Sequence, residues 1–290
     1  MAMDGVITEQ RQRWLDTMYM IIEIYPNLRE SEKKKRPAVD YMETVQEEID
    51  PSMRAILIDW LVYICQGYRL EREILYLTVN YIDRYLSIKP IDRKRFQLLG
   101  VACLIIASKY EHCYLLPTDK FYYADDEILQ MEATVLDVLK FEMTAVTVGC
   151  FVRQMVFGLS ADSRPVALEY MASYISELSL LRYDMLCFAP SLLAASAIFL
   201  ARFVLNPSRK PWNLPLRTFT WYQPSELQEC VNALHALVCE SQNSDDDFPA
   251  AIRKKYSRSK YLFVASIACP APIPLEYFDN VSSSLSSSSK

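Results

Sequence analysis

The stretch MRAILIDWLVYIC, Met53 to Cys65, is predicted to form one helix with apolar residues on all sides. Its apolar residues recur at helical spacing on two sides of one helix. The first stripe holds Met53, Ile56, Leu57 and Trp60, and the second holds Ile58, Leu61, Val62 and Cys65. One stripe can pack in a core. The other needs either a further helix of the chain or a partner bound in a groove, and both interpretations stay open at this point.

Composition predicts a helical protein of two domains. The chain has 290 residues, 51% of them hydrophobic, with only 5 Gly against 15 Pro. This length allows two cores, and so few glycines leave no Gly-rich phosphate loop. The net charge of -5 argues against nucleic-acid binding, because such binding depends on Lys and Arg. We therefore expect a protein partner and no direct contact with nucleic acid.

The sequence carries no catalytic or metal-binding motif. Only His112 and His235 are available, and neither lies near a triad or zinc pattern. The eight cysteines never form a CxxC pair, which is typical of reduced, buried residues of an intracellular protein. We expect no enzyme activity, no cofactor and no metal.

Membrane insertion is not expected either. The N-terminal residues are polar and lack a secretory signal. The longest apolar run, Ala189 to Ala201, is too short to cross a bilayer and is predicted to be a buried core helix.

Helix boundaries can be placed from caps and prolines. A first helix, Glu9 to Tyr25, should break near Pro26. Asp50 should cap the quoted helix, which starts at Pro51 and ends near Gly67. Three more helices follow, over Glu71 to Ser87, Asp92 to about Lys109, and Asp125 to Lys140.

The pattern repeats after 94 residues. This shift places Tyr76 on Tyr170, Leu104 on Ile198 and Ala107 on Ala201. It predicts an N-terminal helix and basic linker (1–39), two similar bundles (40–143 and 144–265), and a Ser-rich, disordered tail (266–290).

Several motifs are similar to those of a known family. The segments MRAILIDWL, LYLTVNYIDRYLS, QLLGVACLIIASKYE and LQMEATVLDVLKFEMTAVT resemble the cyclin box of A-type cyclins. In the second half, ARFVLNPSRKPWN, YQPSEL and AIRKKYSRSKY look most similar to plant A-type cyclins. The resemblance covers Tyr41 to Ala265 and implies an all-α fold of two tandem five-helix cyclin boxes.

The resemblance also implies roles for single residues. Arg54 and Asp83 match a buried ion pair of the family, whose rupture would cost roughly 3 to 5 kcal/mol. Lys109 and Glu132, with Glu111 beside them, match residues that hydrogen-bond the mobile helix of a cyclin-dependent kinase and hold it in its active position.

A docking patch is implied as well. In the family the patch binds Arg-x-Leu segments of substrates and inhibitors, and its residues here are Met53, Ile56, Leu57, Trp60 and Gln97. The family usually has acids just after it, where this chain has Tyr63, Gln66 and Gly67. We therefore expect weakened docking. The segment between Lys109 and Glu132 is also about six residues shorter than usual, and the second Glu of the usual SKYEE is His112.

The function implied is that of an activating subunit of a cyclin-dependent kinase in cell-cycle control. The alternatives are a cyclin-box adaptor, or a degenerate cyclin that binds partners without activating a kinase. The stretch KKKR, Lys33 to Arg36, is consistent with nuclear import or with an ordinary solvated linker, so we expect a nuclear protein with a cytoplasmic pool.

Overall fold

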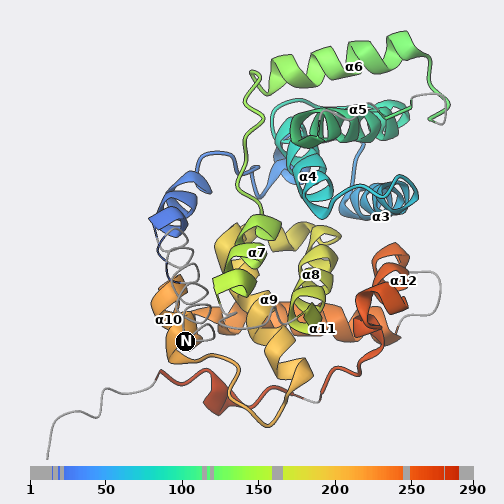
Figure 1. Ribbon diagram of the computed structural model, residues 1–290. Helices are drawn as coiled ribbons and strands as arrows, with labels where there is room; N and C mark the ends of the chain where they lie inside the picture. Colours follow the sequence, from blue (N-terminus) through green and yellow to red (C-terminus); the bar gives the residue numbers. More distant parts are fainter. Residues whose placement is uncertain are drawn as a thin grey trace, which may run out of the picture.

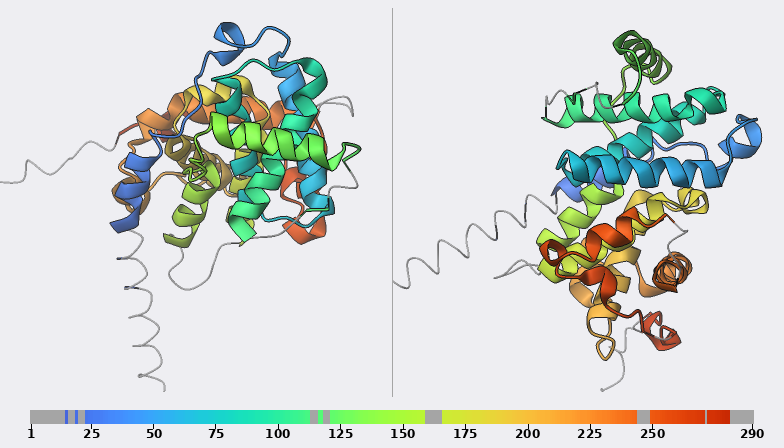
Figure 2. Two further views of the ribbon diagram at one scale, coloured as in Figure 1. Left: turned by 90° about the horizontal axis from the view of Figure 1, so that it is seen from above. Right: turned by 90° about the vertical axis from the view of Figure 1, so that its right-hand side faces the viewer.

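The computed structural model of the chain describes residues 15, 19, 23–112, 116–117, 121–158, 166–243, 249–270 and 272–280. Over these residues it consists of helices joined by turns and loops, with no β-strand. Figures 1 and 2 show two helical bundles stacked one on the other, with the blue segment that begins at residue 23 along one side. None of the described helices is both long and apolar enough to cross a membrane.

The first bundle is built around the quoted stretch. Its helices are α2 (Tyr41–Thr44), α3 (Pro51–Gly67), α4 (Arg72–Leu86), α5 (Arg93–His112) and α6 (Asp125–Val138). The Asp50 carboxylate accepts the Met53 N–H at 2.8 Å, as its predicted N-cap role requires. Helix α5 packs between α4 and α6 (Figure 1). Asp125 opens α6, but the N-cap is Ala124, whose N–H donates to the Glu127 carboxylate.

The second bundle surrounds α9. Its helices are α7 (Val148–Gly158), α8 (Val166–Leu180), α9 (Pro190–Leu205), α10 (Leu214–Thr220), α11 (Pro224–Asn243) and α12 (Ala251–Tyr256). Helix α9 packs against α7, α8 and α11. The apolar run Ala189 to Ala201 lies largely in this buried helix, where small residues allow three neighbours to approach.

The predicted repeat is present in the helix boundaries. A shift of 94 residues brings both ends of α4 onto both ends of α8. The same shift lays α5 over α9 and α3 over α7 within a few residues. The two bundles are therefore two copies of one arrangement.

The N-terminal helix does not break at Pro26. Residues 23–31 are helical without interruption, so the predicted break is wrong. Tyr25 is 1% exposed and packs against Phe151, Phe219 and Trp221 of the second bundle. These aromatic contacts offset the lost backbone hydrogen bond at Pro26. Most of the predicted stretch Glu9 to Tyr25 lies outside the described residues.

The beginning of the predicted tail is packed. Phe278 is buried and stacks on Phe199 of α9 with ring centroids 5.0 Å apart, and Ile273 is buried as well. The expectation of disorder is wrong for 272–280, because two anchors with no helical period are enough to bind the segment. Residues 281–290 lie outside the described part.

The two bundles meet along α3, α4, α7 and α12. Arg72 of α4 forms an ion pair with Glu169 of α8 at 2.6 Å and donates to the Ser173 hydroxyl. A Cβ at Gly149 would lie 2.7 Å from the Tyr76 ring, so α7 can approach α4 only with glycine there. The interface is thus both polar and closely packed.

Candidate functional site

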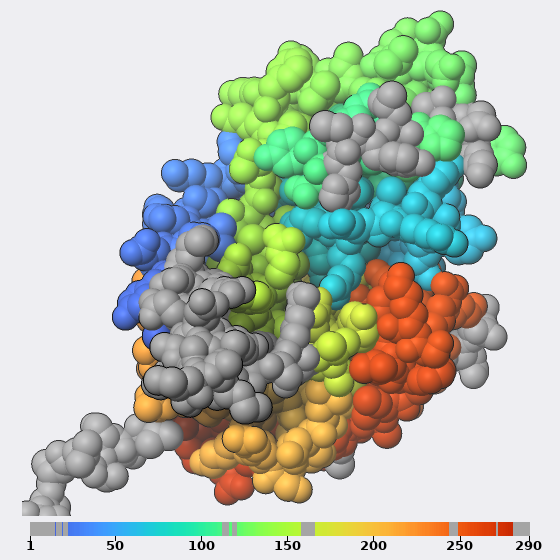
Figure 3. Space-filling model, viewed as in Figure 1, coloured from blue at the N-terminus to red at the C-terminus, as the bar shows by residue number. Residues whose placement is uncertain are grey.

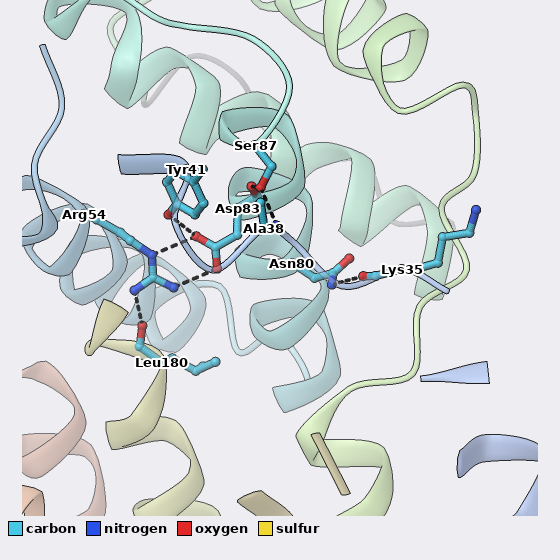
Figure 4. A network of polar contacts seen from close by, with 8 residues as sticks. All are labelled: Lys35, Ala38, Tyr41, Arg54, Asn80, Asp83, Ser87 and Leu180. Carbon is cyan, nitrogen blue, oxygen red and sulfur yellow. Dashed lines mark hydrogen bonds and ion pairs between the residues drawn. The ribbon is translucent and has the colours of Figure 1, made fainter. Parts of the chain in front are cut away.

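Arg54 and Asp83 form a buried, two-pronged ion pair (Figure 4). The Arg54 Nε and Nη2 atoms each lie 2.7 Å from one Asp83 oxygen, and both side chains are at most 2% exposed. Tyr41 donates its hydroxyl to the same carboxylate at 2.8 Å. Arg54 Nη1 donates to the Leu180 carbonyl at the end of α8, also at 2.8 Å. One guanidinium therefore joins the first bundle to the second.

The charges at this pair are mutually stabilised. Burial alone would lower the pKa of Arg54, but the Asp83 carboxylate and, to a smaller extent, Tyr41 together more than offset it and hold that pKa above its ordinary value. Burial, together with the negative charge of Asp83, raises the pKa of Tyr41, which stays a neutral donor.

The basic linker is bound between the bundles. Its carbonyl at Lys35 accepts from Asn80, while the Lys35 ammonium pairs with Glu142 (Figure 4 shows the Asn80 contact). The Arg36 guanidinium donates to the carbonyls of Leu186, Cys187 and Phe188 at 2.8 to 3.1 Å. Lys33 also pairs with Glu30 at 2.8 Å, so three of the four cations in KKKR are engaged within the chain.

Lys109 and Glu132 lie together where α5 packs on α6. The Lys109 ammonium is 2.8 and 2.9 Å from the two oxygens of Glu132. The lysine side chain is 41% exposed, whereas that of Glu132 is 8% exposed. Glu111 is exposed at the end of α5. The three predicted kinase-binding residues are therefore neighbours in sequence or in contact, at an edge of the first bundle.

The predicted docking residues line one groove between α3 and α5. Its volume is about 380 Å³, and it is lined by Met53, Ile56, Leu57, Trp60, Arg93, Phe96 and Gln97. Ile56 is 63% exposed, although it is aliphatic. Gln97 accepts a hydrogen bond from Tyr123 at 3.3 Å, and Trp60 packs edge-on against Phe121. The first stripe of the quoted helix therefore forms an open groove, while the second stripe is buried.

The positions after the groove do not share one surface. Tyr63 is 69% exposed. Gln66 instead faces α12 and donates to the Ala251 carbonyl at 3.4 Å, with its side-chain oxygen buried and without a hydrogen-bond partner. Of the three positions where the family usually has acids, Gln66 thus contacts α12 in this chain, since its place on the helix directs it to the domain interface.

Two features were missed from the sequence. Arg93 lines the groove, and nothing in its polar surroundings indicated this. Glu177 is fully buried on α8 and binds Lys255 at 2.7 Å and the Tyr256 hydroxyl at 2.7 Å. A glutamate inside the apolar run YISELSLL was the available signal for this second buried site.

Family comparisons agree with the architecture. The N-terminal cyclin domain matches residues 23–144, and the C-terminal cyclin domain matches residues 146–270. The chain is 53% identical over 267 residues to Cyclin-A1-3 of Oryza sativa subsp. japonica, covering 88% of this chain and 53% of the relative. It is 50% identical to Cyclin-A1-4 of the same organism, covering 91% of this chain and 76% of the relative. Cyclin-A1-1 of Arabidopsis thaliana is 52% identical, with 89% and 57% covered. The chain thus spans about half the length of several curated relatives that it matches.

Solved structures share the fold. A viral cyclin from herpesvirus saimiri superposes with a TM-score of 0.67 at 23% identity, covering 75% of this chain and 97% of the viral one. A chain of the yeast RNA Pol II CTD kinase CTDK-1 complex superposes with a TM-score of 0.55 at 12% identity, covering 84% and 88%.

Proposed function

The chain belongs to the cyclin family, and from this premise we propose that it is an activating subunit of a cyclin-dependent Ser/Thr protein kinase in cell-cycle control. It would supply no catalytic group of its own. Its contribution would be to bind the active conformation of the kinase more tightly than the inactive one and thereby shift that equilibrium.

The observation that carries this proposal is the Lys109–Glu132 pair. Both Lys109 contacts go to the single carboxylate of Glu132, which leaves the ammonium a further proton to donate. The carboxylate keeps unused lone pairs in the same way. An exposed cation beside a fixed acid can therefore bind both carbonyl and N–H groups of a partner helix without first rearranging.

Kinase binding by single-residue variants tests this. We expect Lys109→Ala and Glu132→Ala to weaken both pull-down of a cyclin-dependent kinase and its phosphorylation of histone, while circular dichroism is unchanged. Lys94→Ala and Asp137→Ala are the matched controls, because both residues are exposed on the same two helices, α5 and α6.

The outcomes separate the alternatives. Unchanged binding by both variants would remove this pair from the interface. Kinase binding without histone phosphorylation would support a degenerate cyclin, whose shortened segment before α6 fails to complete activation. No kinase binding by the unmodified chain would support an adaptor.

We further propose that the α3–α5 groove binds Arg-x-Leu peptides weakly. Apolar anchors such as Trp60 supply most of the affinity at such sites, while charges at the rim set the on-rate and salt dependence. Here the rim lacks an acid at Tyr63, and Arg93 adds a positive charge that opposes a cationic peptide.

Peptide titrations at two ionic strengths examine this docking. We expect Trp60→Ala to abolish binding and Tyr63→Glu to strengthen it and make it more salt-dependent. Leu275→Ala is the control, because this residue is similarly apolar and 73% exposed outside the groove. A strongly salt-sensitive affinity that Tyr63→Glu leaves unchanged would show that the Arg of the peptide binds an acid at another position.

For localisation we propose the nucleus, with a cytoplasmic pool. Lys33 and Lys34 are exposed, although Lys33 pairs with the equally exposed Glu30, whereas Lys35 and Arg36 are only partly exposed and make the contacts described above. If the stretch acts in import, a Lys33→Ala/Lys34→Ala fusion to a fluorescent protein should shift to the cytoplasm. An unchanged distribution would assign the stretch a structural role only.

A further inference from the structure

One cluster of metal-ligating side chains lies outside the surfaces described so far. It consists of His235 and Cys239 on α11 and Cys269 in the segment after α12, and their ligand atoms all lie within 4.8 Å of one another. His235 and Cys239 are four residues apart, so the helix presents both on one face. The third residue comes from a distant part of the sequence, which is why the sequence pattern did not indicate a site.

The segment that carries Cys269 is fixed to α11 by Gln242. The Gln242 amide donates to the Ile267 carbonyl at 2.8 Å, and its oxygen accepts the Cys269 N–H at 3.0 Å. Gln242 lies on the same helix, seven residues after His235. These two bonds hold the cysteine in place beside the other two ligands without any metal.

The hydrogen bond of His235 leaves one of its ring nitrogens available as a metal ligand. Its Nε2 atom lies 3.1 Å from the Pro270 carbonyl, which can only accept, so Nε2 carries the proton in this contact. This leaves the lone pair of Nδ1 to bind a metal. The Cys239 sulfur lies 3.9 Å from Nδ1 and 4.0 Å from Nε2, so the Pro270 contact alone selects the ring nitrogen. Metal-ligating histidines commonly donate their other ring N–H to a carbonyl in this way.

We propose that His235 Nδ1, Cys239 Sγ and Cys269 Sγ bind one Zn²⁺ ion, with water as the fourth ligand. Tetrahedral zinc would place two sulfurs about 3.8 Å apart and a sulfur and a nitrogen about 3.6 Å apart. The present separations, all within 4.8 Å, therefore need to contract by at most about 1.2 Å. Binding turns two thiols into thiolates and releases two protons, so the ion and its two thiolates carry no net charge. Such a neutral complex suits three half-buried ligands.

The ion would link α11 to the segment that leads into 272–280. It would thereby stabilise the second bundle, whereas the Lys109–Glu132 pair and the α3–α5 groove belong to the first. The inference is therefore independent of the proposed kinase function.

Cobalt substitution of the untagged, reduced full chain tests the site. We expect one equivalent of Co²⁺ to give the d–d absorption of tetrahedral cobalt together with thiolate-to-cobalt charge transfer, and Zn²⁺ to displace it. Cys239→Ser and Cys269→Ser should each remove the charge-transfer band or weaken binding at least about 10-fold. Cys187→Ser, a free and exposed cysteine elsewhere, should leave the spectrum unchanged.

Two further variants address the arrangement. Gln242→Ala should weaken Co²⁺ binding by about 10-fold while all three ligands remain, since Gln242 only positions Cys269. His235→Asn should weaken binding and alter the d–d bands. Circular dichroism of each variant shows whether it is folded.

Three results would overturn the proposal: no stoichiometric Co²⁺ uptake by the folded chain, spectra that the two cysteine variants leave unchanged, or a Cys239–Cys269 disulfide in the freshly purified protein that persists under mild reduction. Thiol counting in denaturant distinguishes the last case, because a disulfide hides two thiols and a metal site hides none.

Discussion

The two bundles each bury one carboxylate at the same point of the repeat. The shift that superposes α4 on α8 carries Asp83 onto Glu177. Asp83 receives Arg54 and the Tyr41 hydroxyl, and Glu177 receives Lys255 and the Tyr256 hydroxyl. Each bundle thus holds an acid of its second long helix with one cation and one tyrosine.

The difference lies in where the cation comes from and what else it binds. Arg54 comes from α3, just before α4, and its third contact reaches the Leu180 carbonyl in the other bundle. Lys255 comes from α12, 78 residues after its acid, and lies 5.0 Å from the centre of the Tyr256 ring. The first site therefore joins the two bundles, whereas the second fastens the closing helix of its own bundle to α8.

A second contrast concerns exposure. The repeat places Phe203 at the position of Lys109, and Phe203 is 2% exposed in the core of the second bundle. Only the first bundle presents an exposed cation there. The two bundles adjoin each other in the space-filling view (Figure 3). Because only the first exposes a cation at this position of the repeat, the proposed kinase contact belongs to the first bundle alone.

The largest expected effect is that of Arg54→Ala. It leaves the Asp83 charge buried and removes the bond to the other bundle, so the free energy of unfolding should fall by about 3 to 5 kcal/mol. Thermal and denaturant unfolding measure this loss. Replacing both partners with apolar residues, Arg54→Met with Asp83→Leu, should cost less than either single change. A melting temperature equal to that of the unmodified chain would mean that these charges are not paired in solution.

Lys255→Ala should have the next largest effect and lower the free energy of unfolding by about 2 to 4 kcal/mol. Glu177 is left buried, but Tyr256 still donates to it and no bond between bundles is lost. Hydrogen exchange should show α12 opening first, because Lys255 holds that helix. A loss greater than that of Arg54→Ala would reverse the ranking of the two sites.

How well each buried ion pair could be predicted depends on how far apart its two residues lie in the sequence. Arg54 and Asp83 both interrupt apolar runs within one unit and match a known motif, so their pairing could be predicted. Lys255 is one of several cations in a basic stretch, and no local pattern connects it to Glu177. The direction of the Gln66 side chain and the continuation of the helix through Pro26 could not be predicted either. Both depend on contacts with the second bundle, which no local pattern reveals. Helical period identifies elements well, but it does not say which exposed-looking positions a second domain will cover.

Removing one tyrosine hydroxyl from each buried site compares the two sites directly. Tyr41→Phe and Tyr256→Phe each remove one hydrogen bond to a buried carboxylate, at 2.8 and 2.7 Å respectively, without changing the packing volume. Each should lower the free energy of unfolding by about 1.5 kcal/mol, because a hydrogen bond to a charged group stabilises a protein more than one between neutral groups. Calorimetric melts of the two variants compare them directly. A difference between them of more than about 1 kcal/mol would break the equivalence of the two sites.

The smallest expected effect is a pH-dependent one at the boundary between the bundles. Glu73 lies in the first turn of α4 and accepts the Thr147 hydroxyl just before α7. Burial raises the pKa of Glu73 above its ordinary 4.5, against the opposing effect of the Thr147 bond and of Arg153 and Arg72 nearby, while Glu111 adds to the rise.

The sign of the pH dependence follows from this raised pKa. The folded chain holds the Glu73 proton more tightly than the unfolded chain, so the stability contributed by protonated Glu73 is fully present below about pH 4.5 and is lost as the pH rises through the folded-state pKa. Glu73→Gln keeps an acceptor for Thr147 and removes the charge. We therefore expect the variant to melt slightly above the unmodified chain at pH 7, and this advantage to shrink as the pH falls towards 4.5. Paired melts across this range isolate the contribution of Glu73, because the other titrating groups are common to both proteins. An advantage that does not change with pH would show that Glu73 titrates alike in the folded and unfolded chains, and that the boundary between the bundles is open to water at this position.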